Sequence, residues 1–278
     1  MIGISKIEQG RMGNRLLQYH FLRQIAQKSA VDYFHPQFPD EKFFESLEEH
    51  KRSFGLFKKT IKMNSKDIIK YSPEEFVNLI KKQDEMGKDI GFYPPLMGEV
   101  FFDYLFYPPG DFIKVKKEFR EDFKFISEGK IIVGLHFRGT DFKAWNENAS
   151  LKGEYYINSI KLCLEQLKNQ NLIFVLFTDD LNFSAYTDTV DFLKNSHLEY
   201  YLGDIDKPAI FDFYKLSQCD VIVSSPSTFA IVAGAVGKIN KKIIHAKSWM
   251  DYSLYNNDIF WVQLTKTNNP YYSLWKSI

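Results

Sequence analysis

Uninterrupted apolar runs alternate with segments of helical periodicity through the second half of the chain. Strands that are apolar on both faces are typical of a parallel sheet covered by helices on both sides. The expected strands are 131–136, 172–180, 198–203, 220–225 and 241–246, and the expected helices are 153–169, 187–196, 209–219 and 228–236. This half is therefore predicted to be a Rossmann-type domain with right-handed crossovers.

The first half begins with the same signal, but its later strands are poorly marked. An apolar strand at the amino terminus leads through glycines into a helix within 8–28. One apolar face of this helix is formed by Leu17, Phe21, Leu22, Ile25 and Ala26. The Pro-Pro-Gly at 108–110 marks the end of the first domain. We expect an α/β protein of two Rossmann-like domains, 1–115 and 116–278, facing a cleft.

A second helix in the first half, at 71–87, carries its own start and stop signals. Ser72 is the expected N-cap, and Pro73 stands in the first turn. Glu75 is placed to close a capping box, and Gly87 is placed to end the helix.

Composition narrows the class of protein. The 278 residues are 45% hydrophobic, enough for two cores, and the net charge of +1 predicts no affinity for nucleic acid or an anionic membrane. Cys163 and Cys219 are expected to be buried reduced thiols, which fits a cytoplasmic protein. The amino terminus lacks a basic region and a cleavage site, and no apolar run approaches the ~20 residues of a membrane span.

Glycines and polar residues at 9–15 form the first candidate cluster, QGRMGNR. Gly10 and Gly13 precede a helix, where backbone N–H groups and the helix dipole favour an anion. Arg11 and Asn14 add donors for phosphate or sugar oxygens. A plain strand-to-helix turn is the alternative.

The second cluster, HFRGTDF, follows a buried strand at 136–142. His136 and Arg138 alternate with Phe137, so both point to one side of an extended backbone, and the guanidinium suits a diphosphate. Asp141 is a candidate base or the partner that orients Arg138. The alternative is a salt bridge between Arg138 and Asp141 with no ligand. Open α/β sheets bind ligands at this end of their strands.

Two further clusters follow later strands. Asp179 and Asp180 stand at the end of one strand, either as ligand contacts or as caps of the next turn. Ser227 and Thr228 begin a helix rich in small residues, where they form either a phosphate site or an ordinary helix cap.

Other signals are discounted. The acidic Asp204–Asp206 stretch lies in a polar loop without a second carboxylate or histidine at ligand spacing. The six histidines show no metal-ligand pairing, and no Gly-x-Ser-x-Gly elbow of a hydrolase is present.

Taken together, the clusters resemble the inverting GDP-fucose-dependent fucosyltransferase superfamily, and most closely the bacterial α-1,2-fucosyltransferases of glycosyltransferase family 11. GRMGNRLLQY is similar to the family's G-x-G-N-Q-x-x-Q-Y loop, with Arg15 where Gln is usual. HFRGTD is similar to the H-x-R-R-x-D motif, with Gly139 in place of the second arginine. The LIFVLFTDD and DFYKLSQCDVIVSSPSTF segments resemble further family motifs, but Ile231 and Val232 replace a tryptophan pair.

The resemblance implies a GT-B glycosyltransferase fold, with residues 1–115 on the acceptor side and 116–278 binding the GDP-sugar. Arg138 would offset charge on the departing GDP, and Asp141 or Glu147 would act as general base. The implied donor-binding residues are Gly13, Asn14, His136, Arg138, Asp179, Asp212, Ser227, Thr228 and Phe229. No cofactor or metal is expected.

The implied activity is metal-independent transfer of L-fucose from GDP-fucose, with inversion, to a hydroxyl of a surface glycan or oligosaccharide, with O2 of galactose as the favoured position. The alternatives are transfer of another GDP-sugar of the mannose or heptose type in capsule or O-antigen synthesis, and a non-catalytic protein that binds GDP or a glycan. We expect a cytoplasmic protein without integral membrane segments, whose contact with a membrane-bound lipid-linked glycan would be peripheral, at the inner face.

Overall fold

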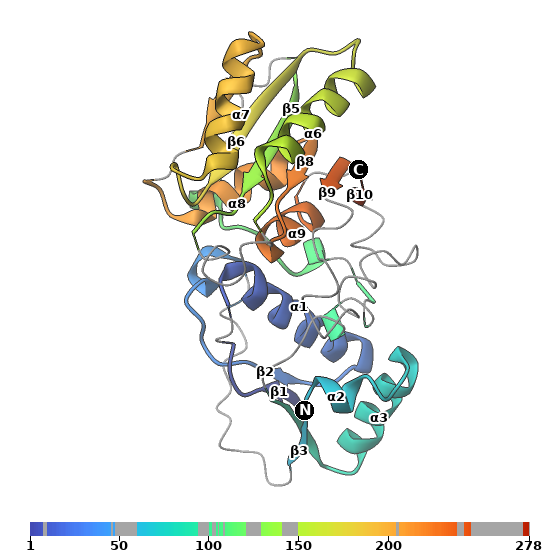
Figure 1. Ribbon diagram of the computed structural model, residues 1–278. Helices are drawn as coiled ribbons and strands as arrows, with labels where there is room; N and C mark the ends of the chain where they lie inside the picture. The colour runs from blue at the N-terminus through green and yellow to red at the C-terminus, as the bar shows by residue number, and fades with distance from the viewer. Residues whose placement is uncertain are drawn as a thin grey trace. The chain divides into compact units, whose positions relative to one another are not determined.

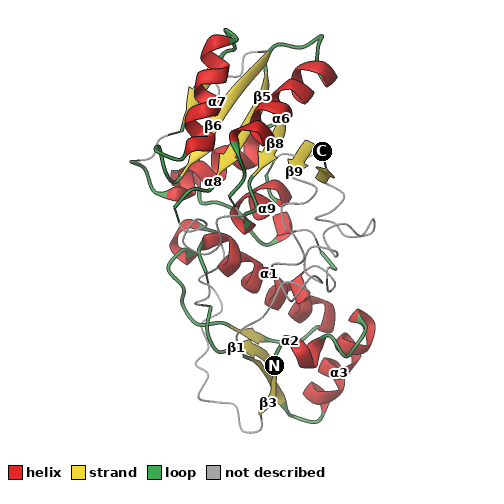
Figure 2. Cartoon of the chain, in the orientation of Figure 1, coloured by secondary structure: helices red, strands yellow, loops and turns green. Residues whose placement is uncertain are grey.

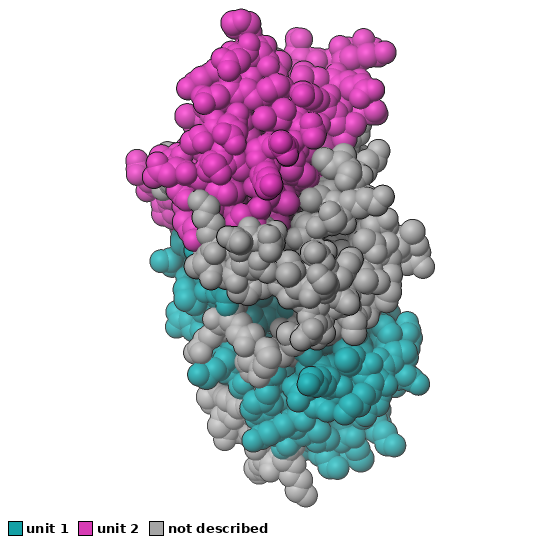
Figure 3. Space-filling model, viewed as in Figure 1, with its two compact units in different colours: residues 1–116, 257–273 teal, residues 117–256, 274–278 magenta. Residues whose placement is uncertain are grey.

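The computed structural model describes residues 1–7, 10–45, 47, 60–93, 100–101, 104, 106–107, 109–120, 129–140, 150–203, 206–237, 242–245 and 275–277 (Figure 1). These residues form two compact units (Figure 3). The first unit contains the described residues up to Lys116, and the second contains those from Lys117 onward up to 245, together with 275–277.

The first unit is built on a parallel sheet of four short strands in the order β2-β1-β4-β3. The strands are β1 (Ile2–Ile4), β2 (Tyr33–Phe34), β3 (Thr60–Met63) and β4 (Asp89–Phe92). The helices are α1 (Met12–Ser29), α2 (Ser65–Ile68) and α3 (Pro73–Glu85), with 3-10 turns at Glu41–Phe43 and Pro109–Asp111. The prediction of a strand, a glycine turn and a helix at the start of the chain is therefore confirmed.

Two helices of this unit illustrate how local sequence decides their ends and their burial. In α3, Ser72 and Glu75 form the predicted capping box, Pro73 is the first helical residue, and Gly87 takes the left-handed conformation just past the end. In α1, the expected single apolar face is only part of the buried surface, because Gln18 and His20 are buried as well.

The second unit contains a six-stranded sheet in which all strands are parallel, in the order β10-β9-β8-β5-β6-β7. The strands are β5 (Ile131–Phe137), β6 (Leu172–Thr178), β7 (Tyr200–Leu202), β8 (Val221–Ser224), β9 (Lys242–His245) and β10 (Trp275–Ser277). The helices are α6 (Gly153–Gln166), α7 (Ser184–Asn195), α8 (Ala209–Gln218) and α9 (Thr228–Ala235), after a 3-10 turn at Lys117–Phe119 (Figure 2).

Helices cover both faces of this sheet, as predicted. Val133, Leu135 and Phe137 point from β5 into a core shared with α6 and α7. The intervening Gly134 faces α8 instead, where a Cβ would lie 2.7 Å from the Sγ of Cys219. The order of the strands reverses between β5 and β8, because the chain runs outward from β5 to β7 and returns to the other side of β5.

Predictions for the second half match the structure closely. The predicted strands and helices all occur, although the helix expected from 187 starts earlier, at Ser184. Cys163 and Cys219 are free and buried, as expected. Among the described residues, no helix combines the length and apolar character needed to cross a membrane.

Candidate functional site

Several of the predicted site residues of the second unit lie where the strand order reverses. His136 is the sixth residue of β5, and Ser225 directly follows β8, the neighbouring strand. The Nδ1 of His136 lies 2.6 Å from the Oγ of Ser225, and the Ser225 N–H donates to the carbonyl of His136 at 3.0 Å. In parallel α/β sheets, ligands bind outside the carboxyl ends of strands at this reversal.

His136 is held as a neutral imidazole by its surroundings. Its side chain is buried, and its ring stacks on the ring of Phe229 at a centroid distance of 5.3 Å. Burial, with the charge of Arg138 adding to it, lowers the pKa of His136 to about 3, although Asp179 opposes the shift. A neutral ring can both donate and accept a hydrogen bond, so His136 suits the recognition of a polar ligand group rather than charge neutralisation.

Arg138 lies just past the end of β5, beside Asp179. Its Nε is 3.5 Å from Oδ2 of Asp179, and only 12% of its side chain is exposed. The alternative to a ligand site, as predicted from the sequence, was a salt bridge between Arg138 and Asp141. Asp141 and the second candidate base, Glu147, lie outside the described residues, so both base assignments stay predictions.

Asp179 connects the loops that follow β5 and β6. Its Oδ1 accepts hydrogen bonds from the N–H groups of Gly139 at 2.8 Å and Thr140 at 3.3 Å, and its Oδ2 accepts one from the Thr140 hydroxyl at 2.7 Å. Burial raises the pKa of Asp179, but these hydrogen bonds and the charge of Arg138 more than offset it, so the pKa is lowered. The ionised carboxylate therefore fixes the loop that carries Arg138.

For Asp179 and Asp180, the sequence left open either a ligand contact or a cap of the next turn. Asp180 has the turn-forming role. Its carboxylate accepts the N–H of Asn182 at 2.9 Å, and its own N–H donates to the hydroxyl of Thr178. Asp179 was assigned to donor binding; its hydrogen bonds give it a positioning role, and the donor contact stays a prediction.

The glycine that replaces the second arginine of the motif is required by packing. A Cβ at Gly139 would lie 2.9 Å from the Cβ atoms of Asp180 and Phe183. Real Cβ atoms are not found this close, so a larger residue at 139 requires the β6–α7 turn to move. Local packing therefore accounts for the glycine that stands at position 139 in place of the motif's second arginine.

The start of α9 supplies the other half of the site. Ser227 caps α9, since its hydroxyl accepts the N–H of Phe229 at 3.3 Å, and Thr228 is the first helical residue and half-buried. Phe229 contacts His136 on one side and Phe213 of α8 on another, at centroid distances of 5.3 and 5.4 Å. Asp212, the residue before Phe213, is half-buried in the first turn of α8.

Gly13 and Asn14 belong to the first unit, in the first turn of α1. The preceding turn depends on Gly10, whose φ of +73° and close approach to Asn14 exclude a side chain. Arg15, at the position where the family has Gln, forms an ion pair with Asp40 and donates to the Gly10 carbonyl at 2.8 Å. Arg15 therefore stabilises the turn.

Two contributors to the site were not predicted from sequence. Ser225 contacts His136 from 89 residues away in the chain, and Thr140 contacts Asp179 from 39 residues away. Both contacts depend on the pairing of strands, which no local signal in the sequence reveals. Within the described part of the chain, no group of three or more His, Cys, Asp or Glu side chains is placed to hold a metal ion.

Comparison with known proteins establishes the class of fold. No family model matches the chain, and no curated protein sequence matches it. Among solved structures, it is similar to POFUT1 in complex with GDP-fucose, with a TM-score of 0.57 and 11% identity over 87% of this chain and 96% of that one. It is also similar to an Arabidopsis thaliana FUT1 mutant in complex with GDP, with a TM-score of 0.53 and 11% identity over 90% of this chain and 71% of that one.

These similarities define the fold as the GT-B fold. The predicted fold class is confirmed.

Proposed function

We propose that the protein is an inverting glycosyltransferase that moves L-fucose from GDP-fucose to a hydroxyl of a glycan, with O2 of a galactose as the favoured position. The observation that carries the proposal is the placement of Arg138 and His136 at the carboxyl end of β5, where the strand order reverses. Both GDP-containing complexes with the same fold support a GDP-sugar as the donor.

The reaction is a single displacement. An acceptor oxygen attacks the anomeric carbon, its bond to the diphosphate oxygen breaks, and GDP leaves with the bonding electrons. The hydroxyl proton passes to a general base, for which Asp141 and Glu147 are the candidates. Inversion at the anomeric carbon follows from the single step.

Charge that accumulates on the departing GDP is the main electrostatic demand of this step. The guanidinium of Arg138, which Asp179 holds in place, would stabilise this negative charge. The N–H groups at the start of α9 would add a second region of positive potential. His136, Thr228 and Phe229 would contact the nucleotide diphosphate, and Asp212 would accept hydrogen bonds from guanine. Gly13 and Asn14 would contact the phosphates from the first unit. This arrangement requires no metal.

One observation favours a second donor. Gly139 replaces an arginine of the motif that the sequence resembles, and its packing leaves no room for a side chain. Another GDP-sugar, of the mannose or heptose type, is therefore the alternative donor.

The donor is tested by measuring GDP release from a panel of GDP-sugars. Turnover of GDP-fucose is expected; turnover of only another GDP-sugar would transfer the assignment to that donor. GDP binding without turnover of any GDP-sugar would favour a non-catalytic binding protein.

The role of Arg138 is tested by Arg138→Lys and Arg138→Ala. We expect both variants to lose at least about a hundredfold in turnover, because a lysine cannot reproduce the guanidinium fork. Lys130→Ala is the matched control, since Lys130 precedes β5 at its other end and pairs with Glu199 at 2.6 Å. Unchanged turnover in Arg138→Ala would refute the diphosphate role.

The setting of the reaction is also a proposal. We place it in the cytoplasm, acting in polysaccharide synthesis on a lipid-linked glycan at the inner face of the membrane, with peripheral contact only.

A further inference from the structure

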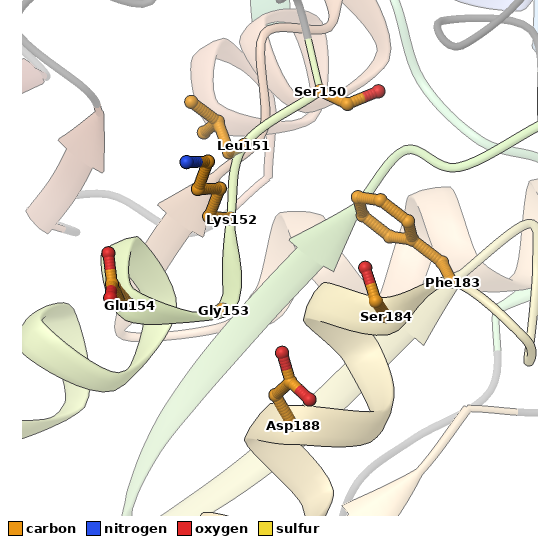
Figure 4. Close-up of a pocket in the computed structure, with 8 residues that line it drawn as sticks. All are labelled: Ser150, Leu151, Lys152, Gly153, Glu154, Phe183, Ser184 and Asp188. Carbon is orange, nitrogen blue, oxygen red and sulfur yellow. The ribbon is translucent and has the colours of Figure 1, made fainter. Parts of the chain in front are cut away.

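A pocket of about 570 Å³ opens between the first turns of α6 and α7. Ser150, Leu151, Lys152, Gly153 and Glu154 lie along one side of it, and Phe183, Ser184 and Asp188 lie along the other (Figure 4). None of these residues is among those assigned to the donor. The volume lies within the range of small-ligand sites.

The pocket is separate from the candidate donor site. His136 and Phe229 lie on the face of the sheet that α9 covers, whereas Phe183 belongs to the core shared with α6 and α7. The loop that carries Arg138 lies between the two, because Gly139 packs against Phe183. A ligand in the pocket would therefore lie on the other side of the arginine loop from the nucleotide.

The charges around the pocket nearly balance. Glu154 and Asp188 supply two carboxylates, and Lys152 supplies one cation. Each helix start adds about half a positive charge. In neither α6 nor α7 does the side chain of the N-cap residue accept a hydrogen bond from a first-turn N–H group. The two carboxylates disfavour an anion, and the lysine and helix dipoles disfavour a cation.

A neutral polyhydroxyl compound matches these groups. Each sugar hydroxyl both donates and accepts, so it can bond to a carboxylate and to an N–H or ammonium group at once. Two serine hydroxyls, Ser150 and Ser184, add further partners. Leu151 and the largely buried Phe183 add apolar surface to the lining.

We propose that this pocket binds a neutral sugar residue of the acceptor glycan. The assignment to the acceptor rests on the proposed function, because a transferase needs a second carbohydrate substrate beside its donor. The binding of a neutral sugar follows from the lining of the pocket alone.

The test is a titration of the full chain with methyl glycosides of galactose, glucose, mannose and N-acetylglucosamine, in which binding is measured by saturation-transfer NMR. We expect at least one glycoside to bind the wild-type protein. Asp188→Asn is expected to weaken that binding about tenfold, because a charge-assisted hydrogen bond is replaced by a neutral one.

The matched control is Asp191→Asn, which removes the same charge from the exposed face of the same helix, outside the pocket. It is expected to bind the glycoside as the wild type does. Ser184→Gln is a second variant, which narrows the pocket at an exposed position and leaves both carboxylates in place. It is also expected to weaken binding, and thermal unfolding shows whether each variant is folded.

Three results would overturn the proposal: no glycoside binds the wild-type protein, Asp188→Asn and Asp191→Asn bind alike, or inorganic phosphate displaces the glycoside. A GDP titration of the same samples tests the proposed function separately. If GDP binds and no glycoside does, the sugar pocket is wrong and the donor site stands. If a glycoside binds as expected and GDP does not, the pocket stands and the proposed function fails.

Discussion

Asp179 determines the position of Arg138 although it belongs to a different strand. It follows β6, and its carboxylate accepts hydrogen bonds from Gly139 and Thr140, the two residues after the arginine. The Arg138 guanidinium lies beside the same carboxylate. Arg138 is therefore held in this position only when β5 and β6 are paired, as they are from Ile131 to Phe137.

Replacing Asp179 tests this dependence. Asp179→Ala leaves the N–H groups of Gly139 and Thr140 without their acceptor, which should lower the free energy of unfolding by about 1–3 kcal/mol. Asp179→Asn keeps an oxygen acceptor and should cost less. The measurement is urea denaturation of both variants, with GDP affinity measured in parallel. Equal stability of Asp179→Ala and wild type would show that the loop does not depend on this carboxylate.

At the level of single residues, sequence alone marked candidate site residues but did not reveal their contacts. The motif marked His136 and Arg138 because a charged cluster at the end of an apolar strand is unusual. It did not reveal Ser225, because only the register of β5 against β8 brings that hydroxyl to the imidazole. It also left open whether Asp179 or Asp180 forms the turn, since either carboxylate fits the local pattern.

The close packing of α8 on β5 depends on Gly134. A Cβ at this position would lie 2.7 Å from the Sγ of Cys219 and 3.0 Å from Cδ1 of Leu216. The glycine therefore lets the helix approach the central strand just before the strand reaches His136.

Gly134→Ala is expected to lower the free energy of unfolding by about 1–3 kcal/mol through overpacking. Cys219→Ala removes the nearest atom, so the double variant should lose less stability than the sum of the two single variants. A double-mutant cycle measured by chemical denaturation gives this coupling. Simple additivity would show that the contact with Cys219 is not the cause.

Most elements of the second unit were predictable because β5, β6 and β8 are largely apolar and α6, α7 and α8 are amphipathic. The short strand β10, with the sequence WKS, was not predicted. The strands of the first unit have a weaker sequence signal. Its strand β2 has two residues, β3 reads TIKM with a lysine, and β4 reads DIGF with an aspartate and a glycine. Such strands form because neighbouring strands and the helices α1, α2 and α3 pack against them. Tertiary packing of this kind leaves no periodic signal.

Each of the two units contains a buried histidine whose pKa is lowered. His20 in α1 is 1% exposed, with Nε2 at 3.0 Å from the Tyr107 carbonyl oxygen, and burial lowers its pKa to about 3 against the opposing effect of that carbonyl. The pKa of His136 in the second unit is lowered to the same value. Both units thus contain a buried histidine that takes up a proton when the chain unfolds in acid.

This similarity predicts how the whole molecule responds to pH. The unfolded chain takes up protons at these histidines near pH 6.5, whereas the folded chain does not until about pH 3. The stability is therefore fully present above about pH 6.5 and falls as the pH drops toward 3, by up to about 1.4 kcal/mol per pH unit for each histidine. Thermal unfolding measured between about pH 7 and pH 5 should show the loss.

The control separates buried from exposed histidine. His20→Gln should make the pH dependence less steep, because one of the two groups that take up a proton on unfolding is gone. His197→Asn, at an exposed position whose left-handed backbone asparagine tolerates, should leave it unchanged. A pH dependence that survives in His20→Gln and His136→Gln together would mean that other groups cause it.

The strand order of the second sheet has a consequence for synthesis of the chain. The described strands of the first unit have all been made once translation passes Phe92, so that unit can begin to fold on the ribosome. The second sheet starts at Ile131 but gains its outermost strand, β10, only when Ser277 has been added. Until then β9 presents an unpaired edge, and unpaired edges invite pairing with other chains. Nascent chains of this protein would therefore be most prone to aggregate late in translation, after most of the second unit has been made.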